Sequence, residues 1–154
     1  MRRALAFAAL LAGLGLLPGL PSGAAAGVGI AGSIGEGVWL GGDEAVRTQV
    51  NFEVLPTYGF GLVSVDLGIV FHLEDRIDLL LRPGARLHLC PVYARLAFPL
   101  KVTDGFDWGF LVGVGAAVGL GPVALFVEAD TSFYDGVDFE VVPLEFRLGV
   151  EIGF

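Results

Sequence analysis

The sequence has few of the residues that enzymes and metal sites use most. Its 154 residues include one cysteine, Cys90, and two histidines, His72 and His88. A single cysteine forms no intrachain disulfide and does not build a cysteine-based zinc site. The histidines form neither an H-x-x-x-H nor an H-E-x-x-H pattern, and P-loop and G-x-S-x-G motifs are absent. We therefore expect no cofactor, no metal site and no catalytic activity.

Charged residues are also scarce. They make up 17% of the chain, whereas a typical soluble domain is about one quarter charged. Hydrophobic residues reach 55% and mean hydropathy is +0.75, which excludes intrinsic disorder. The formal net charge of -8 argues against a nucleic-acid partner, because phosphate binding needs a basic surface. The 24 glycines disfavour long helices.

The N-terminus has the pattern of an export signal. Arg2 and Arg3 precede an apolar run over residues 4–17, and helix-breaking residues and Ala24–Ala26 follow it. The run has about 14 residues, fewer than the roughly 20 that a spanning helix needs. We therefore predict a signal peptide over residues 1–26, cleaved after Ala26. Cleavage would leave one domain, residues 27–154, and loss of the two arginines would change the net charge from -8 to -10.

After residue 27 the sequence alternates between apolar and polar or small residues. This two-residue period is typical of β-strands with two different faces. In the first segment Glu36 is out of phase, and we read the Pro83-Gly84 dipeptide as part of one continuous strand. Eight segments follow this pattern: 28–40, 48–56, 60–73, 77–89, 92–102, 106–120, 123–134 and 141–154.

The length of these segments indicates a membrane barrel. Most exceed the 5–6 residues common in soluble strands and reach the roughly 9–11 that a tilted strand needs to cross a bilayer. An open sheet edge leaves unpaired backbone groups in lipid, so the strands must close. We predict an all-β fold, a closed antiparallel eight-stranded transmembrane barrel. The side chains expected to face lipid are Val63, Leu67, Leu96, Trp108, Val112, Leu148 and Val150.

The connections divide into two kinds. We expect short, uncharged periplasmic turns at Thr57-Tyr58-Gly59, Cys90-Pro91 and Gly121-Pro122. The other connections are rich in acidic residues and are expected to be external, at residues 41–47, 74–76, 103–105 and 135–140. Outer-membrane barrels have short periplasmic turns and longer external loops.

The C-terminus carries a more specific signal. Residues 146–154 alternate and end in Phe154, which resembles the C-terminal signature that the barrel assembly machinery reads in bacterial outer-membrane proteins. With the signal peptide and the eight segments, the chain resembles small eight-stranded barrels of the OmpA/OmpX type, although its external loops are shorter. The resemblance implies a bacterial outer-membrane location. It also implies outer-membrane lipid, lipopolysaccharide and the assembly machinery as partners, and it predicts no oligomeric state.

The polar face of the strands would then line the interior. Hairpin register places Arg86 opposite Arg95, Glu128 opposite Arg147, Lys101 opposite Asp107 and His72 opposite Asp78. The like-charged Arg86 and Arg95 need a carboxylate, for which we expect Asp130. A buried charge needs a partner, so we predict a structural ion-pair network that fills the lumen and leaves no open pore. Its members are Arg86, Arg95, Glu128, Asp130, Glu145 and Arg147.

Three functions remain open from the sequence. The first is a structural or surface-interacting barrel without chemistry of its own. The second is a narrow pathway or binding site for a small solute, hydrophobic or not. The third is a secreted, lipocalin-like soluble barrel, in which the apolar face would point inward. Catalysis is disfavoured, because Ser64 lies eight residues from His72, about 26 Å along a strand.

Overall fold

The computed structural model describes residues 27–40, 46–48, 50–72, 79–103, 107–134 and 142–154. Within these ranges no helix is long and apolar enough to cross a membrane. The predicted signal peptide, residues 1–26, lies outside the described residues. So do the predicted external connections 74–76 and 135–140 and most of 41–47 and 103–105.

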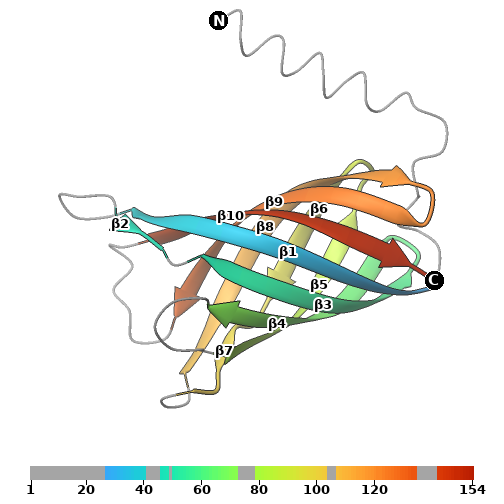
Figure 1. The fold of residues 1–154 in the computed structure, drawn as a ribbon. Helices are drawn as coiled ribbons and strands as arrows, with labels where there is room; N and C mark the ends of the chain where they lie inside the picture. Colours follow the sequence, from blue (N-terminus) through green and yellow to red (C-terminus); the bar gives the residue numbers. More distant parts are fainter. Residues whose placement is uncertain (1–26, 41–45, 49, 73–78, 104–106, 135–141) are drawn as a thin grey trace, which may run out of the picture.

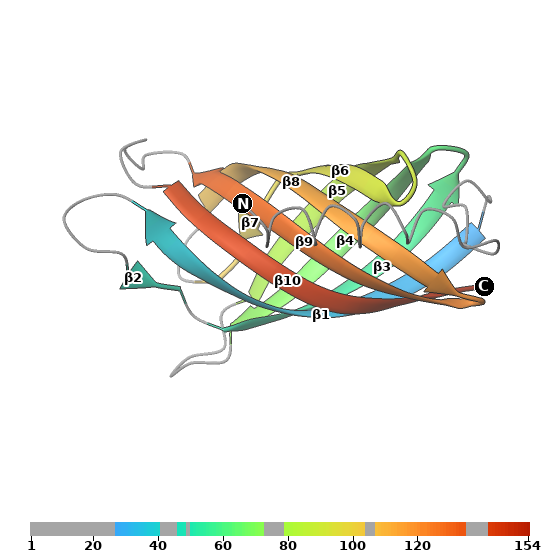
Figure 2. The ribbon, with the colours of Figure 1, turned by 90° about the horizontal axis from the view of Figure 1, so that it is seen from above.

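The described chain forms one antiparallel sheet of ten strand segments. The order along the sheet is β10-β9-β8-β6-β5-β4-β3-β1-β2, with β7 paired to β5 and β8. An additional pairing of β10 with β1 closes the sheet into a barrel (Figures 1 and 2). The segments are β1 (Gly27–Leu40), β2 (Val46–Arg47), β3 (Asn51–Phe60), β4 (Val63–His72), β5 (Leu79–His88), β6 (Val92–Ala97), β7 (Leu100–Lys101), β8 (Asp107–Leu120), β9 (Val123–Tyr134) and β10 (Val142–Gly153).

The ten segments make eight strands of the barrel wall. β2 and β3 both pair with β1, and β6 and β7 both lie between β5 and β8. Each of these two pairs continues one strand across a short interruption. The predicted closed, antiparallel, eight-stranded barrel is therefore confirmed.

Two prolines affect the wall differently. Pro83 lies within β5, which continues through it as predicted. Pro99 instead separates β6 from β7, so the single strand predicted over 92–102 is interrupted. Proline has no backbone N–H to donate to the ladder. The break remains bonded on both sides, because Phe98 N–H donates to the Pro83 carbonyl and Gly109 N–H to the Pro99 carbonyl, both at 2.9 Å.

Three short turns lie at one end of the barrel. Those at Cys90-Pro91 and Gly121-Pro122 fall where we predicted them. The turn predicted at residues 57–59 is wrong, because β3 continues to Phe60 and the chain reverses at Gly61-Leu62. Gly61 has a φ of 64°, a left-handed conformation that glycine adopts without steric cost. The segment predicted over residues 48–56 was accordingly too short.

The strands separate side chains by chemistry, with apolar groups outside and charged groups inside. Of the seven side chains predicted to face lipid, six are 37–60% exposed and Val63 is partly exposed. In contrast, Arg95 is 1% exposed and Glu53 is 0% exposed. The lipocalin-like alternative is therefore wrong, since it requires the opposite arrangement.

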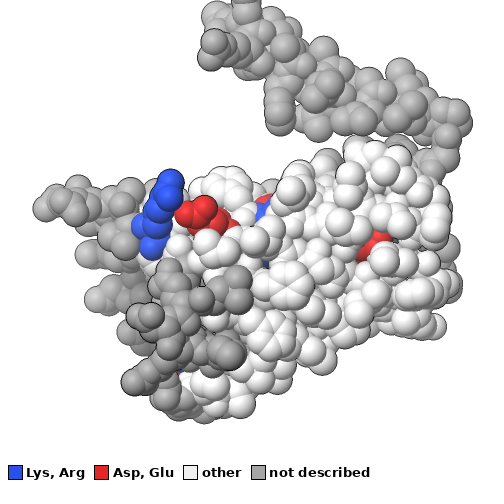
Figure 3. Space-filling model, viewed as in Figure 1, with Lys and Arg blue, Asp and Glu red and all other residues white. Residues whose placement is uncertain are grey.

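The outer wall carries few charges. On the face shown in Figure 3, Lys, Arg, Asp and Glu side chains gather mainly at the end of the barrel where β2 lies. The pair there is Glu36 and Arg47, whose Oε1 and Nη1 atoms are 3.5 Å apart. Glu36 shares the outward phase of Ile30 and Ile34 on β1, so it is a charge on the otherwise apolar outer face, where it pairs with Arg47.

Candidate functional site: the charged interior

The two-residue period of the strands places the charged side chains in the lumen. Arg82 and Arg86 come from β5, Arg95 from β6, and Glu145 and Arg147 from β10. Each of these residues is at most 9% exposed. Because an unpaired buried charge is strongly unfavourable, the partners of these groups determine whether the interior is stable.

Arg95 reaches carboxylates on three other strands. Its Nη2 lies 3.1 Å from Glu53 Oε1 and 2.8 Å from Asp66 Oδ1. Its Nη1 lies 3.0 Å from Glu128 Oε1. The three carboxylates belong to β3, β4 and β9, whereas the wall neighbours of β6 are β5 and β8. The Arg95 side chain therefore makes its contacts across the lumen.

Arg147 approaches two of the same carboxylates from β10. Its Nη1 lies 2.7 Å from Glu53 Oε2 and 3.6 Å from Glu128 Oε1. Two arginines and two glutamates thus alternate in a closed set, which we call the central ring: Glu53, Arg95, Glu128 and Arg147. None of the four residues is more than 3% exposed.

Further ion pairs extend from the central ring toward both ends of the barrel. Arg86 Nε lies 3.3 Å from Asp66 Oδ2, and Arg86 Nη1 lies 3.3 Å from Glu151 Oε2. Toward the other end, Arg82 Nη2 lies 3.3 Å from Glu145 Oε2. Glu145 also accepts a hydrogen bond from the Arg147 guanidinium, which joins this pair to the ring.

Glycines provide the space for these long side chains. A Cβ atom at Gly68 would fall on the Glu53 carboxylate, and one at Gly115 would fall on the Tyr93 ring. The Tyr93 hydroxyl donates to Glu128 Oε2 at 2.8 Å, so the ring packed over Gly115 also supports the central ring. Small residues on β4 and β8 are therefore required by their bulky neighbours.

The structure brings the six predicted network residues into one connected set. The predicted pairing of Asp130 with Arg86 and Arg95 is nevertheless wrong. Asp66 lies between those two arginines, while Asp130 Oδ2 is 3.3 Å from Arg147 Nη1. The reason is that Arg95 extends across the lumen, rather than along the wall over Gly113 toward Asp130.

The predicted network left out four of its members: Glu53, Asp66, Arg82 and Glu151. Hairpin register compares only strands that are adjacent in the wall, whereas the contacts of Arg95 with Glu53 and Asp66 cross the lumen. The signal available was that all four residues share the inward phase of their strands. The predicted backbone partners Lys101 and Asp107 are confirmed. Asp78, the predicted partner of His72, lies outside the described residues.

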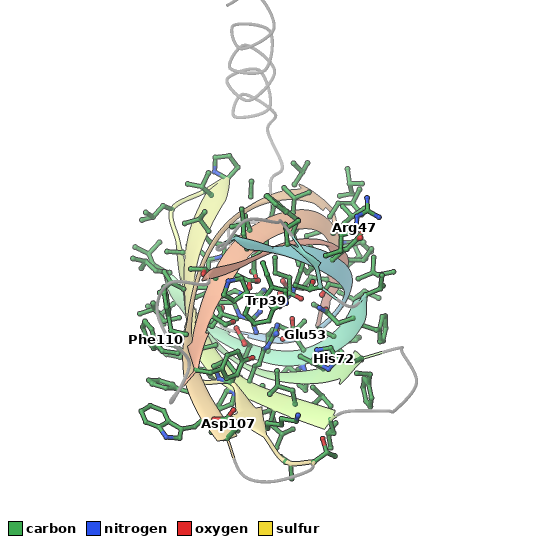
Figure 4. All side chains as sticks on the ribbon, turned by 90° about the vertical axis from the view of Figure 1, so that its left-hand side faces the viewer. Trp39, Arg47, Glu53, His72, Asp107 and Phe110 are labelled. Atoms are coloured by element: carbon green, nitrogen blue, oxygen red, sulfur yellow. The ribbon has the colours of Figure 1, made fainter. Side chains whose placement is uncertain are left out.

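Two cavities lie at opposite ends of the central ring. One, of about 330 Å³, lies at the end with the short turns, and its lining includes the turns Cys90-Pro91 and Gly121-Pro122. The other, of about 320 Å³, lies at the end where β2 is found, and its lining includes Trp39, Arg82 and Asp130. Figure 4 looks into this second end and shows Trp39 and Glu53 pointing inward, while Phe110 points outward. None of the four ring residues lines either cavity.

The interior has few groups arranged for chemistry. Among the described residues, His, Cys, Asp and Glu form no group of three that could hold a metal ion. In the sequence analysis Ser64 was considered as a catalytic partner of His72 and judged too far from it. In the structure its Oγ atom lies 2.9 Å from Nε2 of His88. This pair was missed because the two residues lie on neighbouring strands as diagonal neighbours, with Arg86 directly opposite Ser64 and His88 two residues further on.

Phe154, the predicted assembly signal, ends the last strand of the barrel. Its side chain is 82% exposed, and its backbone N–H donates to the Val28 carbonyl at 2.8 Å. The C-terminal residue is therefore bonded to β1 through its backbone while its ring projects outward.

Comparison with known proteins adds information on the fold. No known protein family matches the sequence, and no characterised protein matches it either. Among solved structures, the chain is similar to Neisserial surface protein A, with a TM-score of 0.56 and 16% sequence identity. The match covers 82% of this chain and 97% of the other. At this identity the likeness shows a common fold.

Proposed function

We propose that the protein is a small bacterial outer-membrane barrel with a structural or surface-interacting role and no chemistry of its own. The distribution of side chains is the observation that carries this proposal. Soluble monomers rarely expose contiguous apolar patches larger than a few hundred Å². Here apolar side chains cover the outside of the barrel, and buried ion pairs fill its middle.

The dimensions of the wall support a membrane location. β1 and β8 each have 14 residues, and β9 and β10 each have 12. A tilted strand needs about 9–11 residues to cross the hydrocarbon core. Exposed aromatic residues lie near both ends of the wall, with Tyr58 and Phe60 close to the Gly61 turn and Trp108 near the opposite end. Such aromatic girdles are typical of membrane–water interfaces.

The two ends of the barrel suggest an orientation. The end with the three short turns carries no charged residue in them, which fits the periplasmic side. The opposite end carries the exposed pair Glu36 and Arg47, which fits the external side and the lipopolysaccharide layer. Delivery would require the signal peptide over residues 1–26 and the barrel assembly machinery.

Cell fractionation tests the location. We expect the protein, expressed at native levels, to remain in the outer-membrane fraction after a high-salt wash and to be released by detergent. A soluble, secreted form would appear in the salt wash or the medium. Release by salt alone would overturn the proposed location.

Conductance separates a structural barrel from a solute pathway. We expect purified wild-type protein to give no steady single-channel current in planar bilayers, because the central ring occupies the lumen. The double variant Arg95→Ser/Arg147→Ser is the matched comparison, since it removes the two longest side chains of the ring and should conduct more readily. Steady current from the wild type would favour the solute-pathway alternative.

A further inference from the structure

The cavity at the end with the short turns is a distinct feature of the lumen. Its volume is about 330 Å³, at the lower end of the range for small-molecule pockets. The inward positions that border it carry residues with little or no side chain, which keeps the space open. These residues are Gly29, Gly59, Ala117, Gly119, Ala124 and Gly153.

One side of this cavity is polar. Ser64 and Thr57, 6% and 7% exposed, line it together with His88 and Glu151. The Ser64 hydroxyl and the His88 imidazole are hydrogen-bonded at 2.9 Å. A hydroxyl has one donor and two acceptor sites, so this pair retains hydrogen-bonding capacity toward a third group.

The cavity has little preference for a charged ligand. Among the described residues that line it, Glu151 is the one acidic side chain, and none is a lysine or an arginine. Glu151 is already paired with Arg86 at 3.3 Å, so it does not act as a free anion. A bound cation would compete with Arg86, and a bound anion would lie beside Glu151 without a free cation in the lining. An uncharged ligand avoids both problems.

The rest of the lining is apolar. Pro91, Pro122 and the buried Tyr93 contribute to it, with Ala117 packed beside Tyr93 in the small apolar cluster of the interior. The His88 and Tyr93 rings are 5.8 Å apart between centroids, which brings the polar side and the apolar side together at one point. A ligand with an apolar body and one hydrogen-bonding group could contact both.

We propose that this cavity is a binding site for a small uncharged molecule with an apolar body and a single hydroxyl group, which the Ser64–His88 pair recognises. The site goes beyond the structural role proposed above and does not require a conducting lumen, because the central ring lies behind it. The test below uses the folded barrel and is independent of its cellular location.

The two histidines of the chain allow a direct test. His88 lines this cavity and His72 lines the cavity at the other end, so each reports on one end of the lumen. The barrel chain, residues 27–154, would be labelled with isotopes at histidine and reconstituted in lipid nanodiscs. It would then be titrated with benzyl alcohol at mildly alkaline pH while the NMR signals of the histidine rings are recorded. We expect saturable shifts of the His88 ring signals and none of the His72 signals.

Ligand and protein variants define what the site recognises. Toluene lacks the hydroxyl and benzoate replaces it with a charge, so both should bind at least about threefold more weakly than benzyl alcohol, as expected for one hydrogen bond. Ser64→Ala should weaken benzyl alcohol binding by about threefold to tenfold. Gly153→Leu should abolish binding, because a Cβ at Gly153 has no atom within 4 Å and the added side chain can enter the cavity without displacing the wall.

The outcomes are distinguishable. Gly32→Leu, on the outer face of β1, is the matched control and should bind benzyl alcohol like the wild type, since a Cβ there meets only Phe52 at 3.9 Å. Non-saturable shifts, equal shifts of both histidines, or equal affinity for benzyl alcohol and toluene would overturn the proposal. Should Ser64→Ala fail to fold, unchanged binding to folded Gly153→Leu would overturn it as well.

Discussion

Arg95 and Arg147 approach the lumen from β6 and β10 and share the same two carboxylates, those of Glu53 and Glu128. The four contacts range from 2.7 to 3.6 Å. Each carboxylate is thus held by two guanidinium groups, and each arginine by at least two carboxylates. This sharing makes the stability of the barrel depend on the ring as a unit.

Loss of Arg95 should destabilise the barrel strongly. Arg95→Ala leaves Asp66 and Glu53 with fewer cations in a buried site, and breaking a buried pair typically costs about 3–5 kcal/mol. Arg47→Ala is the control, because Arg47 is an exposed partner of Glu36 and its loss should cost at most about 1 kcal/mol. Urea unfolding in lipid vesicles, followed by tryptophan fluorescence, measures both. Small, equal effects would indicate a hydrated lumen.

The shared carboxylates predict coupling between the two arginines. Arg95→Met and Arg147→Met together should destabilise the barrel more than the sum of the single changes, because only the double variant leaves Glu53 and Glu128 without either arginine. Contacting residues typically couple by about 0.5–3 kcal/mol. The pair Arg95→Met and Arg47→Met has no common partner and should be additive within about 0.5 kcal/mol. If the changes in unfolding free energy were additive for both pairs of variants, this would contradict the central ring.

The outer wall should reject a charge at mid-depth. Val112 is outward-facing and 37% exposed, so Val112→Arg should make insertion into the bilayer less favourable by about 2–4 kcal/mol. Leu89→Arg places the same charge beside the Cys90-Pro91 turn, where the cost should be about 0–1 kcal/mol. Refolding into vesicles under matched conditions compares the two variants. Equal insertion of both would argue that this surface does not face hydrocarbon.

The glycine at position 115 should be intolerant of a side chain. Gly115→Ala places a Cβ on the Tyr93 ring and should disturb the hydrogen bond from Tyr93 to Glu128, with a cost of about 1–3 kcal/mol. Gly32→Ala, where the nearest atom is 3.9 Å away on Phe52, is the matched control and should be close to neutral. Thermal unfolding of both variants in detergent tests this difference, which should vanish in a Tyr93→Ala background.

Deletion of Phe154 should impair assembly in the cell more than folding in the test tube. Its ring is exposed, so little packing is lost when it is removed. We expect reduced envelope levels at native expression, while the purified, truncated chain still refolds into vesicles. Phe154→Tyr keeps a terminal aromatic residue and serves as the control. Normal envelope levels of the truncated protein would count against an assembly signal at this position.

Much of the fold followed from local pattern. Alternation along each segment separated the two faces of each strand, and segment length favoured a spanning barrel over a soluble sheet. Where local chemistry was ambiguous, the predictions were less accurate. Thr57-Tyr58-Gly59 resembled a turn, but Gly61 provides the left-handed conformation that the reversal uses. Pro99 interrupted a strand that alternation alone described as continuous.

The sequence by itself determined which side chains share a face of each strand, because successive residues of a strand point to opposite sides. It also determined the like-charged neighbours Arg86 and Arg95, because hairpin register follows from the turns. The tertiary structure decided that the charged face is the inner one. Only the tertiary structure decided that Asp66, not Asp130, lies between these arginines, and that Ser64 meets His88. Closure of the barrel brings strands that are not neighbours in the wall within reach of one another across a narrow lumen. Which side chains pair there depends on their length and direction, and the alternation along a single strand does not contain this information.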